Sequence, residues 1–281
     1  MPRQIVISIG TSLLTNLMFL PDLNDFLPPP PPVDRARLQG EIDRFLNLEC
    51  PGFPPKQYRQ LIDESLKNGE PQGCLKNFYE RYVKQLSAPD TIKRHYGYRG
   101  TGSRDCLPAE ISTLYHFYYE SQDQPENGDN DIITLLCTES VESVSCAVVI
   151  KKIIENNPLF TEFCTFPTEK SIQVIENLNM HQGAGQWVAS VVHPTKPQRR
   201  IVDPDCGFSH LKEGLLIIME NEDETILLRT GGYKELAADL KILAAEFGLY
   251  SLSLFENSRE TVETRPETQV PDLSTLIFSY I

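Results

Sequence analysis

The stretch DIITLLC, residues 131–137, is an apolar run that lacks the polar alternation of a half-exposed strand. Such a run is typical of a parallel β-strand that is buried on both faces of its sheet. The polar residues TESVES follow it, and apolar residues over 144–155 predict a helix. A buried strand that leads directly into a helix indicates an α/β fold built on a parallel sheet.

The same alternation of strands and helices continues on both sides of this stretch. A β-branched run at residues 5–9 predicts the first strand of the chain. Downstream, the pattern predicts a strand at 171–178 and a helix at 208–222, and then a strand, a tight turn and a helix in succession over 223–247. A strand at 249–257 and a last alternating strand at 259–267 follow, and QWVASVVH (186–193) fits either a helix or a strand. This order predicts a Rossmann-like, mostly parallel open sheet with helices on both faces.

The segment between the first two predicted strands has a different composition. Five consecutive prolines, Pro28–Pro32, impose polyproline geometry and form either a surface spacer or a recognition ligand. Helical patterns follow at 34–48, 56–67, 74–86 and from 108 onward. We therefore predict a single domain over 1–281, in which residues 21–105 form a proline-rich spacer and a helical insertion after the first strand.

A basic, tyrosine-containing stretch, KRHYGYRGTGSR (93–104), lies at the end of this insertion. Its glycines predict a loop. Arginine and tyrosine side chains together suit the binding of phosphates and the stacking of bases, and a solvated surface loop is the alternative.

Composition limits the classes of partner. A net charge of -13 argues against a protein that binds long nucleic acid by bulk electrostatics, although a small anionic ligand can still be held by backbone N–H groups. Seven cysteines, an odd number without a C-x-x-C pair, argue against a disulfide scaffold or a metal ribbon and favour reduced thiols in a cytoplasmic protein. No apolar run of about twenty residues predicts a membrane span.

Three predicted turns carry the candidate site: IGTSLLTN (9–16), TES (138–140) and LLRTGGYK (227–234). Each follows a predicted strand, and ligands of open parallel sheets bind at the carboxyl ends of the strands. Glycine allows close backbone approach there, and the N–H groups of the next helix attract an anion. The candidate ligand-binding residues are Gly10, Thr11, Leu13, Asn16, Thr138, Glu139, Ser140, Thr230, Gly231, Gly232 and Tyr233. Neither a Walker loop nor a dinucleotide-binding G-x-G-x-x-G pattern after a strand is present.

The pair IGTSLLTN near the N-terminus and TGGYK after a late strand resembles the CARF family, the CRISPR-associated Rossmann-like domains that sense cyclic oligoadenylates. The closest similarity is to the branch whose first motif is G-T-S-L-L-T-N. The resemblance covers residues 1–20 and 106–265, and the insertion between them has no counterpart. It implies a homodimer that binds cyclic tetra-adenylate or hexa-adenylate across its two-fold axis.

Many CARF proteins carry a fused ribonuclease domain with an R-x(4–6)-H pair, and none of the five histidines of this chain fits that spacing. Because only residues 268–281 follow the last predicted strand, we expect no C-terminal effector. The resemblance is then to the stand-alone ring nucleases, which cleave the cyclic messenger without a metal or a cofactor and switch the response off. In these a ribose 2′-OH attacks the neighbouring phosphodiester and leaves a 2′,3′-cyclic phosphate. A non-catalytic sensor that acts through a partner is the alternative.

The catalytic candidates under this resemblance are Ser12, to position the sugar or the scissile phosphate, and Lys234, to stabilise the developing charge. Both residues also have a structural interpretation. Ser12 fits the N-cap of a helix, and Lys234 fits a solvated lysine in a first helical turn. Ser140 likewise fits an N-cap.

Overall fold

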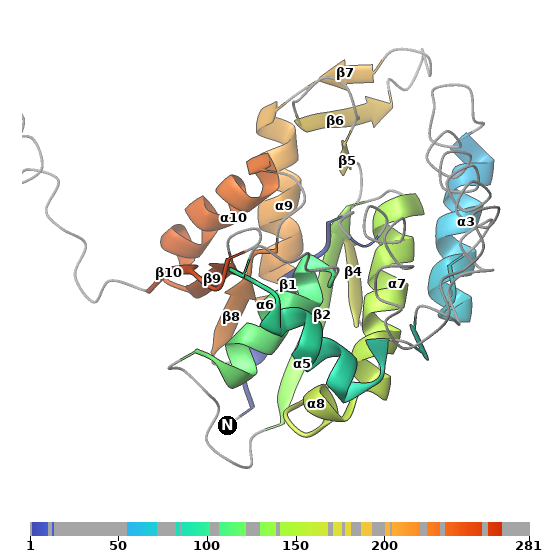
Figure 1. Cartoon of the computed structure of the whole chain (residues 1–281). Coiled ribbons are helices and arrows are strands. Elements are labelled where there is room, and N and C mark those ends of the chain that lie inside the picture. The colour runs from blue at the N-terminus through green and yellow to red at the C-terminus, as the bar shows by residue number, and fades with distance from the viewer. Residues whose placement is uncertain are drawn as a thin grey trace, which may run out of the picture.

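Strand β1 (Gln4–Ser8) lies inside a seven-stranded sheet that forms the centre of the molecule (Figure 1). The other strands of this sheet are β2 (Asp131–Thr138), β3 (Cys164–Thr165), β4 (Ile172–Ile175), β8 (Thr225–Leu228), β9 (Tyr250–Leu254) and β10 (Thr261–Thr264). The computed structural model describes residues 2–10, 13, 55–71, 83–84, 86–101, 107–121, 130–138, 141–167, 171–175, 178–180, 187–192, 200–202, 204–219, 224–230, 234–254 and 258–265.

The order of the strands is β10-β9-β8-β1-β2, and β3 and β4 both pair with the outer side of β2. All of these pairings are parallel except that of β10 with β9. In the register, Ile5 lies opposite Ile133 on one side and Ile226 on the other. The predicted Rossmann-like, mostly parallel open sheet is therefore confirmed.

The chain reverses its direction of sheet growth between two neighbouring strands. From β1 it adds β2, β3 and β4 on one side, and it then returns to place β8 and β9 on the other side of β1. We call the place between the carboxyl ends of β1 and β8 the switch point, because ligands of open α/β sheets bind at this position.

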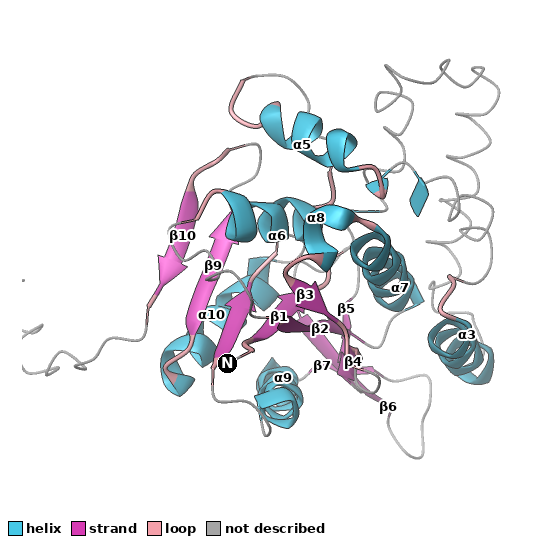
Figure 2. Ribbon diagram, turned by 90° about the horizontal axis from the view of Figure 1, so that it is seen from below, coloured by secondary structure: helices cyan, strands magenta, loops and turns pink. Residues whose placement is uncertain are grey.

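Helices cover both faces of the sheet (Figure 2), which explains why its strands are continuously apolar. On one face, Ile5 and Ile7 join the larger core cluster with α6 (Ala109–Tyr119) and α7 (Val141–Asn156). On the other face, Val6 joins a second cluster with α9 (Pro204–Met219) and α10 (Lys234–Phe247). Gly214 lets α9 lie close to β4, since a Cβ at this position would be only 3.3 Å from the Cγ1 atom of Ile175, the last residue of β4.

The predicted helical insertion between β1 and β2 is present in the described residues. It includes α3 (Pro55–Asn68), which packs against α7, and α5 (Pro89–Gly97), which packs against α6. The expected helix at 34–48 and most of the one at 74–86 lie outside the described residues. The short helix α8 (Pro158–Thr161) was not anticipated.

The prediction of a loop over residues 93–104 is wrong for residues 93–97, which belong to α5. Three of its aromatic or basic side chains, His95, Tyr96 and Arg99, are buried. Tyr96 packs on Tyr115, with ring centroids 4.6 Å apart, and its hydroxyl lies 2.6 Å from His116 Nδ1 in a buried hydrogen bond. Tyr96 is thus part of the protein interior rather than a surface for stacking bases.

The His116 imidazole makes stability depend on pH. Burial lowers the pKa of His116 below its ordinary value of 6.5, so folding favours the neutral ring. Above pH 6.5 the ring is neutral in both states, and this contribution to stability is fully present. As the pH falls from 6.5 through the folded-state pKa, the unfolded chain takes up a proton before the folded protein does, so the contribution is lost. We expect the free energy of unfolding, measured with urea, to decrease over this interval. His116→Gln should flatten part of that decrease, and an identical pH profile in this variant would contradict the assignment.

A second, three-stranded antiparallel sheet consists of β5 (Leu178–Met180), β6 (Trp187–Val192) and β7 (Arg200–Val202). The segment 187–192 is therefore a strand and not a helix. This sheet lies beyond the carboxyl end of β4 (Figure 1), and β5 contacts β2. None of the described helices has the length and apolar character needed to cross a bilayer.

Candidate functional site

The carboxyl ends of β8, β1 and β2 lie side by side, so the three predicted turns start at adjoining strands. The chain leaves β1 and β8 toward opposite faces of the sheet. Leu13, after β1, belongs to the core cluster of α6 and α7, whereas α10, after β8, packs on the other face. This divergence is what defines a ligand-binding switch point in doubly wound folds.

Two hydroxyl residues join β1 to β8 directly beneath the switch point. The last pair in the register is Ile7 with Leu228, and Ser8 and Thr230 extend the connection beyond it. The Thr230 N–H donates to Ser8 Oγ at 3.0 Å, and the Thr230 hydroxyl donates to the Ser8 carbonyl. Ser8 Oγ also donates to the Leu228 carbonyl at 3.5 Å. Both side chains are buried, so they fix the separation of the two turns.

Removing the Ser8 hydroxyl tests this connection. We expect Ser8→Ala to lower the free energy of unfolding by about 1–3 kcal/mol, because the buried Thr230 N–H loses its acceptor. Urea denaturation measures the change. Thr230→Ser, which keeps a hydroxyl and the N–H donor, is the control and should lose less stability. An equal loss in both variants would show that the hydrogen bonds do not account for the effect.

The β1 side of the switch point carries a carboxylate of the protein itself. The Gly10 N–H donates to Glu110 Oε1 at 2.8 Å. Glu110 lies in the first turn of α6 and is 1% exposed. The preceding amide, Ile9 N–H, donates to the Leu136 carbonyl at 2.8 Å and so continues the β1–β2 pairing. The first glycine of the motif is thus held by a carboxyl side chain from α6, 100 positions further along the chain.

The β8 side carries a buried positive charge. Arg229, directly after β8, is 4% exposed. Its guanidinium donates from Nε to Ser251 Oγ at 3.1 Å, from Nη1 to the Ala237 carbonyl at 3.5 Å and from Nη2 to the Val262 carbonyl at 3.4 Å. All three acceptors are neutral, and burial lowers the pKa of Arg229. The side chain connects β9, β10 and the first turn of α10 behind the Thr230 turn.

The third turn, after β2, is held by a hydroxyl from the helix that follows. Thr138 is 3% exposed, and its N–H donates to Ser143 Oγ at 3.3 Å. Ser143 lies in the first turn of α7, so this contact fixes the start of the helix against the end of the strand. Of the predicted TES turn, the structure describes Thr138 only.

The structure places four predicted site residues at these strand ends or just beyond them: Gly10, Leu13, Thr138 and Thr230. The Leu13 side chain packs in the core and is 2% exposed. Lys234 is the first residue of α10, but the structure does not describe its side chain. The other predicted residues lie outside the described residues: Thr11, Ser12, Asn16, Glu139, Ser140, Gly231, Gly232 and Tyr233.

Three residues of this edge were missed by the sequence analysis. Ser8 and Arg229 could have been found, because each is a polar residue at the end of an apolar strand. Glu110 gave no such signal, since it is 100 positions from Gly10 in the sequence.

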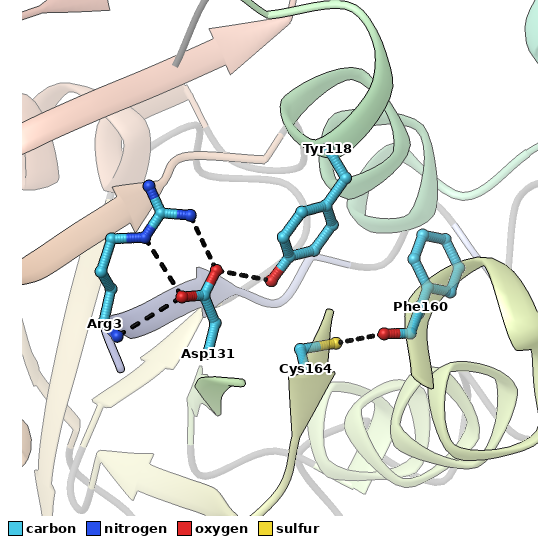
Figure 3. A network of polar contacts seen from close by, with 5 residues as sticks. All are labelled: Arg3, Tyr118, Asp131, Phe160 and Cys164. Atoms are coloured by element: carbon cyan, nitrogen blue, oxygen red, sulfur yellow. Dashed lines mark hydrogen bonds and ion pairs between the residues drawn. The ribbon is translucent and has the colours of Figure 1, made fainter. Parts of the chain in front are cut away.

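A separate polar cluster lies at the opposite, amino edge of the sheet (Figure 3). The fully buried Asp131 carboxylate accepts hydrogen bonds from Arg3 Nε at 3.1 Å, from Arg3 Nη2 at 2.9 Å and from the Tyr118 hydroxyl at 3.1 Å. The Arg3 backbone N–H adds a longer contact of 3.4 Å. Because its members bind one another, this cluster joins β1, β2 and α6 and is structural.

No group of three or more His, Cys, Asp or Glu side chains in the described part of the chain could hold a metal ion. No protein-family model matches the sequence, and no curated protein matches it either.

Proposed function

We propose that the chain binds a cyclic oligoadenylate, with cyclic tetra-adenylate as the first candidate, at the switch point and across the two-fold axis of a homodimer. The observation that carries the proposal is the placement of the two glycine-containing motifs after adjacent strands, β1 and β8, that diverge to opposite faces. The choice of ligand rests on the resemblance of IGTSLLTN and TGGYK to the CARF motifs.

The charges around β8 favour a phosphate on that side. The buried Arg229 guanidinium lies behind the turn, and α10, a helix of 14 residues, begins at Lys234. The N-terminus of a helix of this length attracts anions through its unpaired N–H groups and its dipole. A phosphodiester above the turn would therefore be stabilised from two directions.

We further propose that the bound ring is cleaved at its phosphodiester bonds. A ribose 2′-OH attacks the adjacent phosphorus, the bond from phosphorus to the 5′-oxygen breaks, and the products are a 2′,3′-cyclic phosphate and a 5′-hydroxyl. In this scheme Ser12 orients the attacking ribose and Lys234 stabilises the negative charge of the transition state. The chemistry requires no metal ion. Such a protein would end type III CRISPR signalling in the cytoplasm.

A single-turnover assay tests the proposed function. Excess protein is incubated with labelled cyclic tetra-adenylate in EDTA, and the products are separated by chromatography. The expected result is a linear product that ends in a 2′,3′-cyclic phosphate. Intact ring that elutes with the protein would contradict cleavage and indicate the non-catalytic sensor. Intact ring that elutes apart from the protein would contradict both functions.

A further inference from the structure

We propose that α5 is held on α6 by a pH-sensitive latch, in which protonation of His116 releases α5 locally while the sheet and its other helices stay folded. The latch is a conformational device that does not depend on the ligand of the switch point. It gives a role to Tyr96 and Arg99 of the basic, tyrosine-containing stretch, which the proposed function does not use.

The helix α5 depends on its contacts with the rest of the protein. It has nine residues and no side-chain cap at its N-terminus, and helices of this length are marginal in isolation. It lies outside α6, on the side away from the sheet (Figure 2). At its C-terminal end, Arg99 Nε donates to the Ser258 carbonyl at 2.9 Å. In return, Arg259 Nη2 donates to the Gly97 carbonyl at 3.0 Å, and its guanidinium lies over the Tyr96 ring. Because arginine stays charged at every pH of interest, these contacts do not change with pH.

The hydrogen bond between Tyr96 and His116 is fully satisfied only when the imidazole is neutral. Burial raises the pKa of Tyr96, so the hydroxyl keeps its proton and donates to His116 Nδ1. In the described part of the chain the hydroxyl has no other acceptor. A protonated imidazole carries a hydrogen on Nδ1 as well, so two donors would face each other. If the hydroxyl turned to accept instead, its own hydrogen would be buried without a partner, which weakens the docking of α5.

The charged groups that face His116 are distributed unequally between the two sides of the latch. Glu120, at the C-terminal end of α6, and Glu263 of β10 both favour the protonated ring. Arg99, which follows α5, disfavours it. The carboxylates belong to elements that stay in place, whereas the like charge belongs to the segment that carries α5. Separation of α5 therefore relieves the repulsion by Arg99 and leaves the attraction by both carboxylates intact.

Hydrogen exchange in the full chain tests the latch. The protection factors of the backbone amides in α5 and α7 are measured at pH 7.5 and pH 5, each at several low urea concentrations. We expect protection in α5 to fall about fivefold on acidification, as for the loss of one hydrogen bond. It should depend only weakly on urea, because local opening exposes little surface. The amides of α7 should show the strong urea dependence of global unfolding.

Two variants identify the group that responds to pH. His116→Gln offers a side-chain oxygen to the Tyr96 hydroxyl and gains no charge, so its α5 protection should be equal at both pH values. His210→Gln, which changes a partly exposed histidine of α9, is the matched control and should keep the wild-type response. A fall that persists in His116→Gln would overturn the role of His116 and assign the response to another group, such as His95, the buried histidine of α5 itself.

Measurements on the wild type cover the case in which His116→Gln does not fold. The fall in α5 protection must follow the titration of the His116 ring, which NMR observes directly. Unchanged protection in α5 would show that it does not open. A urea dependence in α5 equal to that in α7 would show that α5 opens only with the whole protein. Either result would overturn the latch.

Discussion

Asp131→Ala is expected to lower the free energy of unfolding by about 3–5 kcal/mol, which is the cost of removing one partner from a buried ion pair. The side chain of Asp131 is fully buried, and it accepts hydrogen bonds from Arg3 and Tyr118 (Figure 3). Without it, the largely buried Arg3 guanidinium loses its counterion, and the Tyr118 hydroxyl loses its acceptor. Urea denaturation of the two proteins measures the difference.

An exposed ion pair provides the control for this substitution. Glu155 pairs with Lys151 one turn away on α7, and both side chains are partly exposed. Glu155→Ala should therefore cost no more than about 0.5 kcal/mol. If Asp131→Ala and Glu155→Ala had similar effects, the cluster at the amino edge would not have the stabilising role that its burial implies.

Lys234→Ala is expected to reduce the single-turnover rate of ring cleavage by about 100- to 1000-fold, as does removal of one group that stabilises transition-state charge in other enzymes. The matched control is Lys241→Ala, an exposed lysine two turns further along α10, which should keep the wild-type rate. Equal rates in both variants would exclude Lys234 from the chemistry. The labelled cyclic tetra-adenylate assay in EDTA provides the rates.

Ser12 requires two substitutions, because a helix cap and a ribose-positioning group make different demands. Ser12→Ala removes both roles and should slow cleavage to a similar extent. Ser12→Asn keeps the ability to cap a helix but lacks the hydroxyl. An active Ser12→Asn protein would assign Ser12 to capping alone, whereas an inactive but folded one supports its role at the ribose.

The central strands were predictable because burial on both faces leaves a continuous apolar run. The run at 131–137 became β2, and the β-branched run near the N-terminus became β1. The small sheet of β5, β6 and β7 was not predicted, because two of its strands have three residues each and carry little pattern of their own.

The sequence of α5 contains the spacing of a buried helical face, but its composition is typical of a loop. Ile92, His95 and Tyr96 are buried at the spacing of one helical face. The neighbouring lysine, arginine and glycines gave the stretch the composition of a loop. Burial of Tyr96 depends on Tyr115 and His116 of α6, which the local sequence does not contain.

Dependence on partners that are distant in the sequence also limits prediction of the candidate site. Turns after strands can be located from glycines and hydroxyl residues, and the shared edge follows from parallel pairing. The Glu110 contact with Gly10 and the Arg229 contacts with Ser251 and Val262 join segments far apart in the chain, so they depend on the completed fold.

The stoichiometry of ligand binding tests the central claim most directly. Cyclic tetra-adenylate with fluorine in place of each 2′-hydroxyl cannot be cleaved by 2′-OH attack, so its binding can be titrated at equilibrium by calorimetry. A ring held across a two-fold axis between two switch points predicts saturation at one ring per two chains. Saturation at one ring per chain, or the absence of binding by a folded protein, would contradict the account.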